Sequence, residues 1–298
     1  MDAGAKVRAY YTLRWLAERY VVTLAAFTRA DDPPEAVEHL RKLCRAVHTV
    51  PMRRSAVRDG LALVDSLRQG ESFIIRRDRS AEMYRLLQGL ASEQHFDVVH
   101  ADQLWMAQYA LGYKLNVHMF AGVYQPRLVL DEHNACYQIF ERLARGERNP
   151  LKRWVWGREA LLLKKYEAET CGQFDRVVTV TEEDRKILEG MAGGQVGGSP
   201  VFSTIPICVD TAEVPAVQPA RDGMNVLHMG TMFWPPNVEG VLWFGREVWS
   251  RVAAELPLAS LAIVGKNPPA QIQSLGGDGR VAVAGYAVDA QPWLERAG

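Results

Sequence analysis

Four polar side chains stand together where an apolar stretch ends, in the segment LVLDEHNA: Asp131, Glu132, His133 and Asn134. The apolar residues predict a buried strand, and loops at strand ends carry function more often than other segments. An imidazole that is uncharged near neutral pH hydrogen-bonds a hydroxyl group or accepts a proton. We therefore take His133 as the candidate catalytic residue, expected to orient a substrate rather than to act as a nucleophile. The alternative is that a lone histidine is structural.

The same pattern occurs one predicted strand earlier, in HADQLW, where Asp102 and Gln103 follow an apolar run. Carboxylate and amide groups at such a position bind hydroxyl groups. We expect Asp102, Gln103 and Asn134 to bind hydroxyl groups of a ligand.

Three later strands each end in a glycine, in VLHMG, LAIVG and VAVAG: Gly230, Gly265 and Gly285, with Lys266 beside the second. Ligands of parallel sheets bind beyond the carboxyl ends of the strands, and glycine lets backbone N–H groups reach an anion there. The three turns together predict a nucleotide site, although the GxGxxG fingerprint is absent. Ordinary tight turns and a solvated Lys266 are the alternative. Gly4, just before a helix, is a further anion-binding candidate, unless it belongs to a frayed terminus.

Apolar runs alternate with helical periodicity along the whole chain, which predicts an α/β fold with parallel sheets covered on both faces. The strands are expected at 21–27, 48–52, 96–101, 127–134 and 175–181, and then at 224–230, 259–265 and 280–286. Two such series predict two Rossmann-like domains in tandem. The expected limits are 1–207 for the first domain, 208–223 for a linker and 224–298 for the second domain. Both ends look cut, because a strand before residue 2 is missing and the second series stops after three strands.

Composition excludes several classes of protein. Of the 298 residues, 35 are basic and 35 acidic, so the chain lacks the basic excess of a nucleic-acid binder. No apolar run is long enough for a membrane span. The cysteines and histidines are scattered without zinc-site spacing, so we expect no metal and four reduced, mostly buried thiols in a cytoplasmic protein. The cysteines are Cys44, Cys136, Cys171 and Cys208.

Two segments are locally basic. Residues 51–85 contain eight arginines and five acidic residues, and residues 141–170 contain eight basic and five acidic residues together with Trp154 and Trp156. Basic surface with aromatic side chains docks on anionic lipid headgroups. The interpretation we favour from the sequence is solvated helix faces with the tryptophans in the core.

Taken in order, eight motifs resemble the GT-B glycosyltransferases of family 4, and most closely a bacterial subgroup associated with exopolysaccharide synthesis. The motifs are DAGAKVR, FDVVHADQ, LVLDEHNA, KKYEAETCGQFDRVVTVTEEDRKIL, IPICVDT, VLHMGTMFWPPNVEGVLWF, LAIVGKNPP and VAVAGYAVD. The resemblance implies two Rossmann-like domains, with the acceptor on the first and a nucleotide-diphosphate sugar mainly on the second. Asp102, Gln103 and Asn134 would then bind the acceptor. It also implies transfer with retention of anomeric configuration and without a required metal.

The resemblance also implies roles for single residues. His133 would contact the donor sugar near the reacting carbon, and the remaining positions would bind the donor: Gly4, Gly230 and Thr231 at the phosphates, and Gly285, Tyr286 and Val288 around the base. Many relatives carry an arginine and a lysine after the glycine that is Gly230 here, whereas this chain has Thr231 next and no cation before Arg246. Lys266 is our candidate to compensate. The glutamate-bearing segment that follows in the family is absent, because the sequence ends first.

These observations predict a retaining glycosyltransferase that moves a sugar from a nucleotide-diphosphate sugar to a glycan or lipid-linked acceptor. Its expected place is cell-surface polysaccharide synthesis, in the cytoplasm, with peripheral contact at the inner membrane face, and without nucleic acid. A non-catalytic nucleotide-sugar-binding fragment and a GT-B epimerase or hydrolase are the alternatives. A nicotinamide-dependent oxidoreductase is disfavoured because the dinucleotide fingerprint is missing.

Overall fold

The computed structural model describes residues 4–121, 125–192, 200–214, 216–218, 220, 223–232 and 235–298. It divides into two compact units, residues 8–208 and residues 1–7 with 209–298. In both units the described strands pair only in parallel. This confirms the predicted α/β class with Rossmann-like parallel sheets, as in the GT-B fold. The described residues of 208–223 form turns and irregular backbone, and the predicted domain limits stay a prediction.

The larger unit contains two parallel sheets. One pairs β1 with β2, and the other has the strand order β3-β4-β5-β6. The strands are β1 (Thr23–Thr28), β2 (Ala46–Pro51), β3 (Val98–Asp102), β4 (Arg127–Glu132), β5 (Arg176–Thr179) and β6 (Val201–Thr204). The sequence did not predict β6, because its four residues lie between Pro200 and Pro206 and are too few to show a period. It pairs with β5 in the register Val177↔Phe202 and completes the edge of the sheet.

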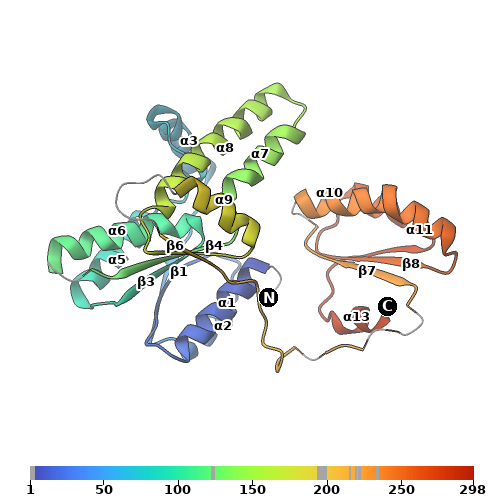
Figure 1. Ribbon diagram of the computed structural model, residues 1–298, viewed down its shortest axis with the longest axis horizontal. Helices are drawn as coiled ribbons and strands as arrows, with labels where there is room; N and C mark the ends of the chain where they lie inside the picture. Colours follow the sequence, from blue (N-terminus) through green and yellow to red (C-terminus); the bar gives the residue numbers. More distant parts are fainter. Residues whose placement is uncertain are drawn as a thin grey trace. The chain divides into compact units, whose positions relative to one another are not determined.

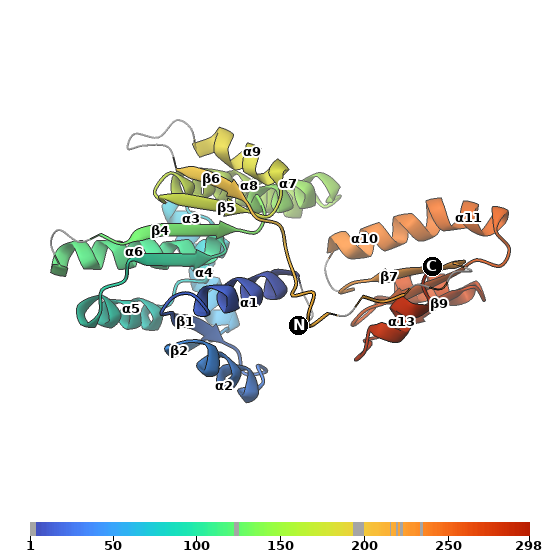
Figure 2. The ribbon, with the colours of Figure 1, turned by 60° about the horizontal axis from the view of Figure 1, so that its bottom comes forward.

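Nine helices of the described residues belong to this part of the chain. They are α1 (Gly4–Ala17), α2 (Pro34–Leu43), α3 (Ala56–Gln69), α4 (Phe73–Arg77), α5 (Ala81–Glu93), α6 (Leu104–Ala121), α7 (Cys136–Gly146), α8 (Pro150–Cys171) and α9 (Glu182–Ala192). Serine begins three of them, since the hydroxyls of Ser55, Ser72 and Ser80 accept a backbone N–H of the first turn. Figures 1 and 2 show α7 and α8 lying side by side. Leu128, Leu130 and other apolar strand residues pack with Leu163 of α8 in the core.

A buried glutamate of α8 holds the start of α4. Glu159 accepts hydrogen bonds from the Ser72 hydroxyl at 2.5 Å and from the backbone N–H groups of Phe73 and Ile74 at 3.1 Å. A negative charge at a helix N-terminus satisfies otherwise unpaired N–H groups and complements the helix dipole. The contact therefore fastens the α3–α4 region to α8.

The expectation that the tryptophans of α8 lie in the core is wrong for one of them. Trp154 is 59% exposed. Trp156 packs against Phe140 of α7, with ring centroids 5.9 Å apart. The two residues are two positions apart, which places them on different faces of the helix.

The smaller unit contains a three-stranded parallel sheet in the order β7-β8-β9. Its strands are β7 (Asn225–Met229), β8 (Ser260–Val264) and β9 (Val281–Ala284), and its helical segments are α10 (Pro235–Trp243), η1 (Phe244–Trp249), α11 (Ser250–Glu255), α12 (Ala270–Gln273), η2 (Ser274–Gly277) and α13 (Gln291–Arg296). Figure 1 shows α10 and α11 on one face of the sheet and α13 on the other. Leu261, Ile263 and Trp249 form the centre of its core.

Gly265 is required by a close backbone approach. A Cβ atom at this position would lie 1.9 Å from the carbonyl oxygen of Gly230. We expect Gly265→Ala to lower the free energy of unfolding by about 1–3 kcal/mol, because the two strand ends would have to move apart. Urea denaturation followed by circular dichroism measures this. Gly240→Ala is the matched control, since no atom lies within 4 Å of its added Cβ; it should leave stability unchanged or raise it, and equal losses for both variants would contradict the explanation.

Candidate active site

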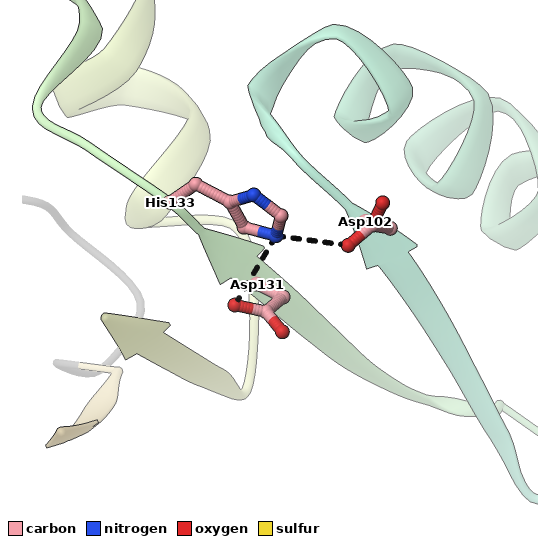
Figure 3. Close-up of side chains that lie close together, drawn as sticks. All are labelled: Asp102, Asp131 and His133. Carbon is pink, nitrogen blue, oxygen red and sulfur yellow. Dashed lines mark hydrogen bonds and ion pairs between the residues drawn. The ribbon is translucent and has the colours of Figure 1, made fainter. Parts of the chain in front are cut away.

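The candidate site lies at the carboxyl ends of β3 and β4, which are neighbours in the sheet. The register pairs Asp102 with Asp131, so both carboxylates lie at the same edge. His133 follows two residues later, and its Nε2 lies 3.0 Å from Asp102 Oδ1 and 3.9 Å from Asp131 Oδ1. Figure 3 shows the imidazole pointing across the strand ends toward both carboxylates. The structure thus brings together two residues that the sequence predicted, Asp102 and His133.

Arg8 of α1 balances the charge of Asp131. The side chains are 3% and 2% exposed, and the guanidinium bonds the carboxylate through Nε at 2.9 and 3.1 Å and through Nη2 at 2.8 Å. Arg8 Nη1 also donates to the backbone carbonyl of Ile205 at 2.5 Å. A buried carboxylate is tolerated only when it is paired and hydrogen-bonded, which Arg8 provides. Sequence reasoning missed Arg8, because 123 positions separate it from Asp131 and no spacing signals the contact.

The hydrogen-bonding pattern assigns a tautomer to His133. Nε2 faces carboxylate oxygens and therefore carries a proton, so in the neutral ring Nδ1 is the acceptor. Nδ1 is buried and has no hydrogen-bond partner among the described residues. A buried acceptor without a partner is unfavourable until a donor reaches it. The site is therefore prepared to receive a hydroxyl group at His133 Nδ1.

His100 lies on the other side of Asp131, with Nε2 3.8 Å from Oδ2. Burial lowers the pKa of His100, and this effect exceeds the opposing attraction of Asp131 and Asp102. A neutral His100 leaves Arg8 as the cation that compensates Asp131.

Two other predicted residues lie outside this hydrogen-bonded group. Gln103 has a positive φ of 73°, and its Oε1 accepts a hydrogen bond from Trp105 Nε1 at 3.2 Å. Asn134 is exposed. Their proposed role in acceptor binding stays a prediction.

A second buried group holds the loop that carries His133. Glu167 of α8 accepts hydrogen bonds from the backbone N–H groups of Cys136 at 2.6 Å and Tyr137 at 3.2 Å, which are the first residues of α7. Asp184 of α9 accepts from the N–H of Ala135 at 3.0 Å. The chain on the C-terminal side of His133 is thus fixed by two carboxylates from other helices.

Glu132 lies against this group and is fully buried. Its carboxyl oxygens, the Cys136 sulfur and the Glu167 carboxylate come within 4.8 Å of one another, and Glu132 Oε2 has no hydrogen-bond partner among the described residues. Burial first, and then the charge of Glu167, raise the pKa of Glu132 well above its usual range. The protonated form of Glu132 is therefore favoured. Burial also raises the pKa of Glu167, although the hydrogen bonds that Glu167 accepts from Glu132 and from two backbone N–H groups oppose this rise.

The described residues contain two groups with ligand atoms suited to a metal ion: Asp102, Asp131 and His133, and Glu132, Cys136 and Glu167. Neither fits a divalent cation well. In the first, the Arg8 guanidinium already occupies the Asp131 carboxylate and would repel a cation. In the second, Glu132 is protonated and burial raises the pKa of the Cys136 thiol.

The strand-end glycines of the smaller unit use their N–H groups within the sheet. Gly230 donates to the Val264 carbonyl at 3.0 Å, and Gly265 donates to the carbonyls of Ala284 and Gly285 at 3.3 and 3.1 Å. These two amides are therefore not free donors for an anion, and the close packing of Gly265 explains its residue type.

The other predicted donor-binding positions remain accessible. Lys266 is exposed and has no ion pair among the described residues. Tyr286 and Val288 are 62% and 92% exposed. Thr231 is held by Asn237, whose Nδ2 donates to the Thr231 carbonyl at 3.0 Å. Gly4 begins α1 and is exposed. Donor binding at all these positions stays a prediction.

The prediction of four mostly buried thiols agrees with the structure. All four cysteines are free, and three of them are buried, whereas Cys208 is exposed. No helix in the described part of the chain combines the length and the apolarity needed to cross a membrane.

Comparisons with known proteins address the family directly. A search of curated proteins found no match to this chain. The family model described as Glycosyltransferase Family 4 matches residues 3–213, which include α1, the sheet β3-β4-β5-β6 and the whole Asp102–His133 site. A role in glycosyl transfer, with a sugar donor and an acceptor as substrates, follows from this match. The chain belongs to Glycosyltransferase Family 4.

Proposed function

We propose that this protein is a retaining glycosyltransferase that moves a sugar from a nucleotide-diphosphate sugar to a glycan or lipid-linked acceptor in cell-surface polysaccharide synthesis. One observation carries the proposal. In a chain of this family, His133 offers a buried Nδ1 without a partner, while Asp102 holds Nε2 at 3.0 Å. Such an acceptor suits a sugar hydroxyl, and the fixed imidazole suits a residue that orients the sugar.

In the proposed mechanism, departure of the nucleoside diphosphate leaves an oxocarbenium-like sugar, and the acceptor hydroxyl attacks on the face that the diphosphate leaves. The diphosphate oxygen takes the acceptor proton, so no protein nucleophile is needed. The carboxylate of Asp102 adds negative charge beside His133, and a fixed charge of this kind stabilises developing positive charge without reorganisation. Lys266, Thr231 and Gly285 are our candidates to bind the leaving diphosphate.

We extend the proposal to metal independence and to location. The Arg8–Asp131 ion pair fills the place that a cation would need at the strand ends, which supports a reaction without a metal. The expected location is the cytoplasm, with peripheral contact at the inner membrane face.

His133→Ala tests the proposed role of the imidazole. We expect it to lower kcat for sugar transfer by roughly 100-fold, the loss that a misplacement of the reacting group by about 1 Å produces. His133→Asn keeps a hydrogen-bonding atom near the position of Nδ1 and should retain more activity. His118, an exposed residue of α6 bonded to Gln125, provides the control variant His118→Ala. Undiminished transfer by His133→Ala would remove the histidine from the mechanism.

The alternatives differ in what happens to the donor. The assay measures nucleoside diphosphate release from a panel of UDP-, GDP-, ADP- and dTDP-sugars, with and without a lipid extract as acceptor source. Release that requires the extract supports transfer, and the anomeric configuration of the product by NMR tests retention. Release without an acceptor identifies a hydrolase, a changed sugar identifies an epimerase, and calorimetric binding without turnover identifies a non-catalytic binder.

A further inference from the structure

Helix α3 turns its apolar side to the solvent. Val57, Leu61 and Val64 are 73%, 65% and 53% exposed, and Leu67 is 52% exposed. The first three are spaced by four and three positions, which places them on one face. The opposite side carries Ser66, which is fully buried and whose hydroxyl donates to the Glu71 carbonyl at 2.7 Å. Helices of soluble proteins ordinarily bury the apolar face, so this orientation requires an explanation.

The neighbouring helix repeats the feature. Leu151, Trp154 and Val155 of α8 are 69%, 59% and 42% exposed, at positions that again share one face. Arg158, the next residue of this stripe, donates to the Ser66 carbonyl at 2.9 Å and joins the two helices. Figure 1 shows α3 beside α8. We call the four exposed residues of α3, Val57, Leu61, Val64 and Leu67, the apolar face.

An arginine-rich pocket opens at the start of α3. It has a volume of about 160 Å³ and lies where β1 and β2 end and where α3 and α5 begin. Six arginines line it, against two acidic residues: Arg53, Arg54, Arg58, Arg77, Arg79 and Arg85, with Asp78 and Glu82. A chain of zero net charge thus concentrates positive charge beside the apolar face.

Half of these arginines are already paired. Arg54 and Arg77 form ion pairs with Asp78, at 2.7 and 3.1 Å. Arg79 pairs with Glu71 at 3.2 Å. In contrast, the ion pairs of the described residues include none for Arg53, Arg58 or Arg85, which therefore retain unused N–H donors. Guanidinium groups bind phosphate oxygens in a bidentate manner, which makes the pocket suited to a phosphate group.

We propose that the apolar face and the arginine pocket dock this protein on an anionic phospholipid bilayer. The apolar side chains enter the headgroup–acyl boundary, and the arginines bind lipid phosphates. A bilayer is the occupant that the charge favours, because it supplies apolar depth and phosphate groups at the same boundary. This assigns a surface to the membrane location proposed above and does not depend on sugar transfer.

Vesicle co-sedimentation in the absence of any sugar donor tests this proposal. We expect binding to phosphatidylcholine vesicles that contain phosphatidylglycerol, weaker binding at high salt and little binding to phosphatidylcholine alone. Leu61→Glu/Val64→Glu and Arg53→Glu/Arg58→Glu should each weaken binding at least tenfold. Two matched controls should bind as the unaltered protein does: Leu115→Glu, at a 66% exposed leucine of α6, and Lys42→Glu, at an exposed lysine of α2.

Several outcomes would overturn the docking surface. They are failure of the unaltered protein to bind the anionic vesicles, undiminished binding by either double variant, and equal losses in the controls. A dimer that light scattering detects without lipid, and that Leu61→Glu/Val64→Glu dissolves, would show that a second copy covers the face instead. Circular dichroism of each variant establishes that it is folded. Transfer to a soluble glycan is measured separately, so loss of docking and failure of the proposed reaction remain distinguishable.

Discussion

Replacing Arg8 by methionine should lower the free energy of unfolding by about 3–5 kcal/mol, the range for removing one partner of a buried ion pair. Methionine preserves most of the length of the side chain. The loss of unfolding free energy therefore comes mainly from the missing guanidinium and not from a cavity. Asp131 would remain 2% exposed, with its three guanidinium contacts gone. Urea denaturation followed by tryptophan fluorescence and circular dichroism measures the change.

Two comparisons separate the ion pair from other effects of the Arg8 substitution. Arg19, just beyond α1, is 45% exposed and pairs with Glu18 at 3.1 Å, so Arg19→Met should change stability by less than about 1 kcal/mol. Adding Asp131→Leu to Arg8→Met should restore part of the loss, because no uncompensated charge remains. A loss below about 1 kcal/mol for Arg8→Met, or a double variant less stable than the sum of the single losses, would contradict this account.

Replacing Glu132 by glutamine should remove a pH dependence of stability. The folded protein keeps a proton on Glu132 after the unfolded chain has lost it, so between the ordinary pKa of 4.5 and the raised folded value the native state binds more protons. Stability then falls as pH rises, by about 1.4 kcal/mol per pH unit for one proton. The difference in unfolding free energy between Glu132→Gln and the unaltered protein should therefore grow as pH rises above 4.5, for as long as the folded protein keeps the proton on Glu132.

Denaturation curves at several pH values measure the Glu132 effect. Subtracting the curves of the two proteins removes the contribution of His100, whose lowered pKa acts in the opposite direction and weakens the fold as pH falls below 6.5. Glu93→Gln, at the exposed end of α5, is the control for loss of one carboxyl group. Parallel pH profiles for Glu132→Gln and the unaltered protein would show that Glu132 is ionised in the fold.

The sequence indicated both Asp102 and His133 as candidates for a physical reason, although it did not predict their hydrogen bond. Apolar runs separated by helices predict parallel strands, and parallel strands end at one edge of the sheet, so polar residues that follow neighbouring runs come together. The same reasoning located most of the strands. It failed for β6, where four residues between a glycine-rich stretch and prolines carry too little periodicity.

The sequence does not predict contacts that depend on tertiary packing. Arg8 meets Asp131, and Glu167 meets the N-terminus of α7, only because helices fold over the strand ends. Periodicity also does not show which face of a helix is buried. For this reason the expectation that Trp154 lies in the core is wrong. From the sequence, the strand-end glycines predict N–H groups that bind a phosphate. The structure gives another reason for a glycine at Gly265, which is its close packing against the backbone of Gly230.

Helix α8 carries two buried carboxylates, and each accepts hydrogen bonds from the first N–H groups of a different helix. Glu159 fastens the start of α4, and Glu167, eight positions or about 12 Å along the axis, fastens the first residues of α7 next to His133. A single continuous rod therefore connects the segment that carries the arginines with the loop that carries the imidazole. A bilayer bound at the arginine pocket would therefore hold the imidazole at a distance that the length of this helix sets.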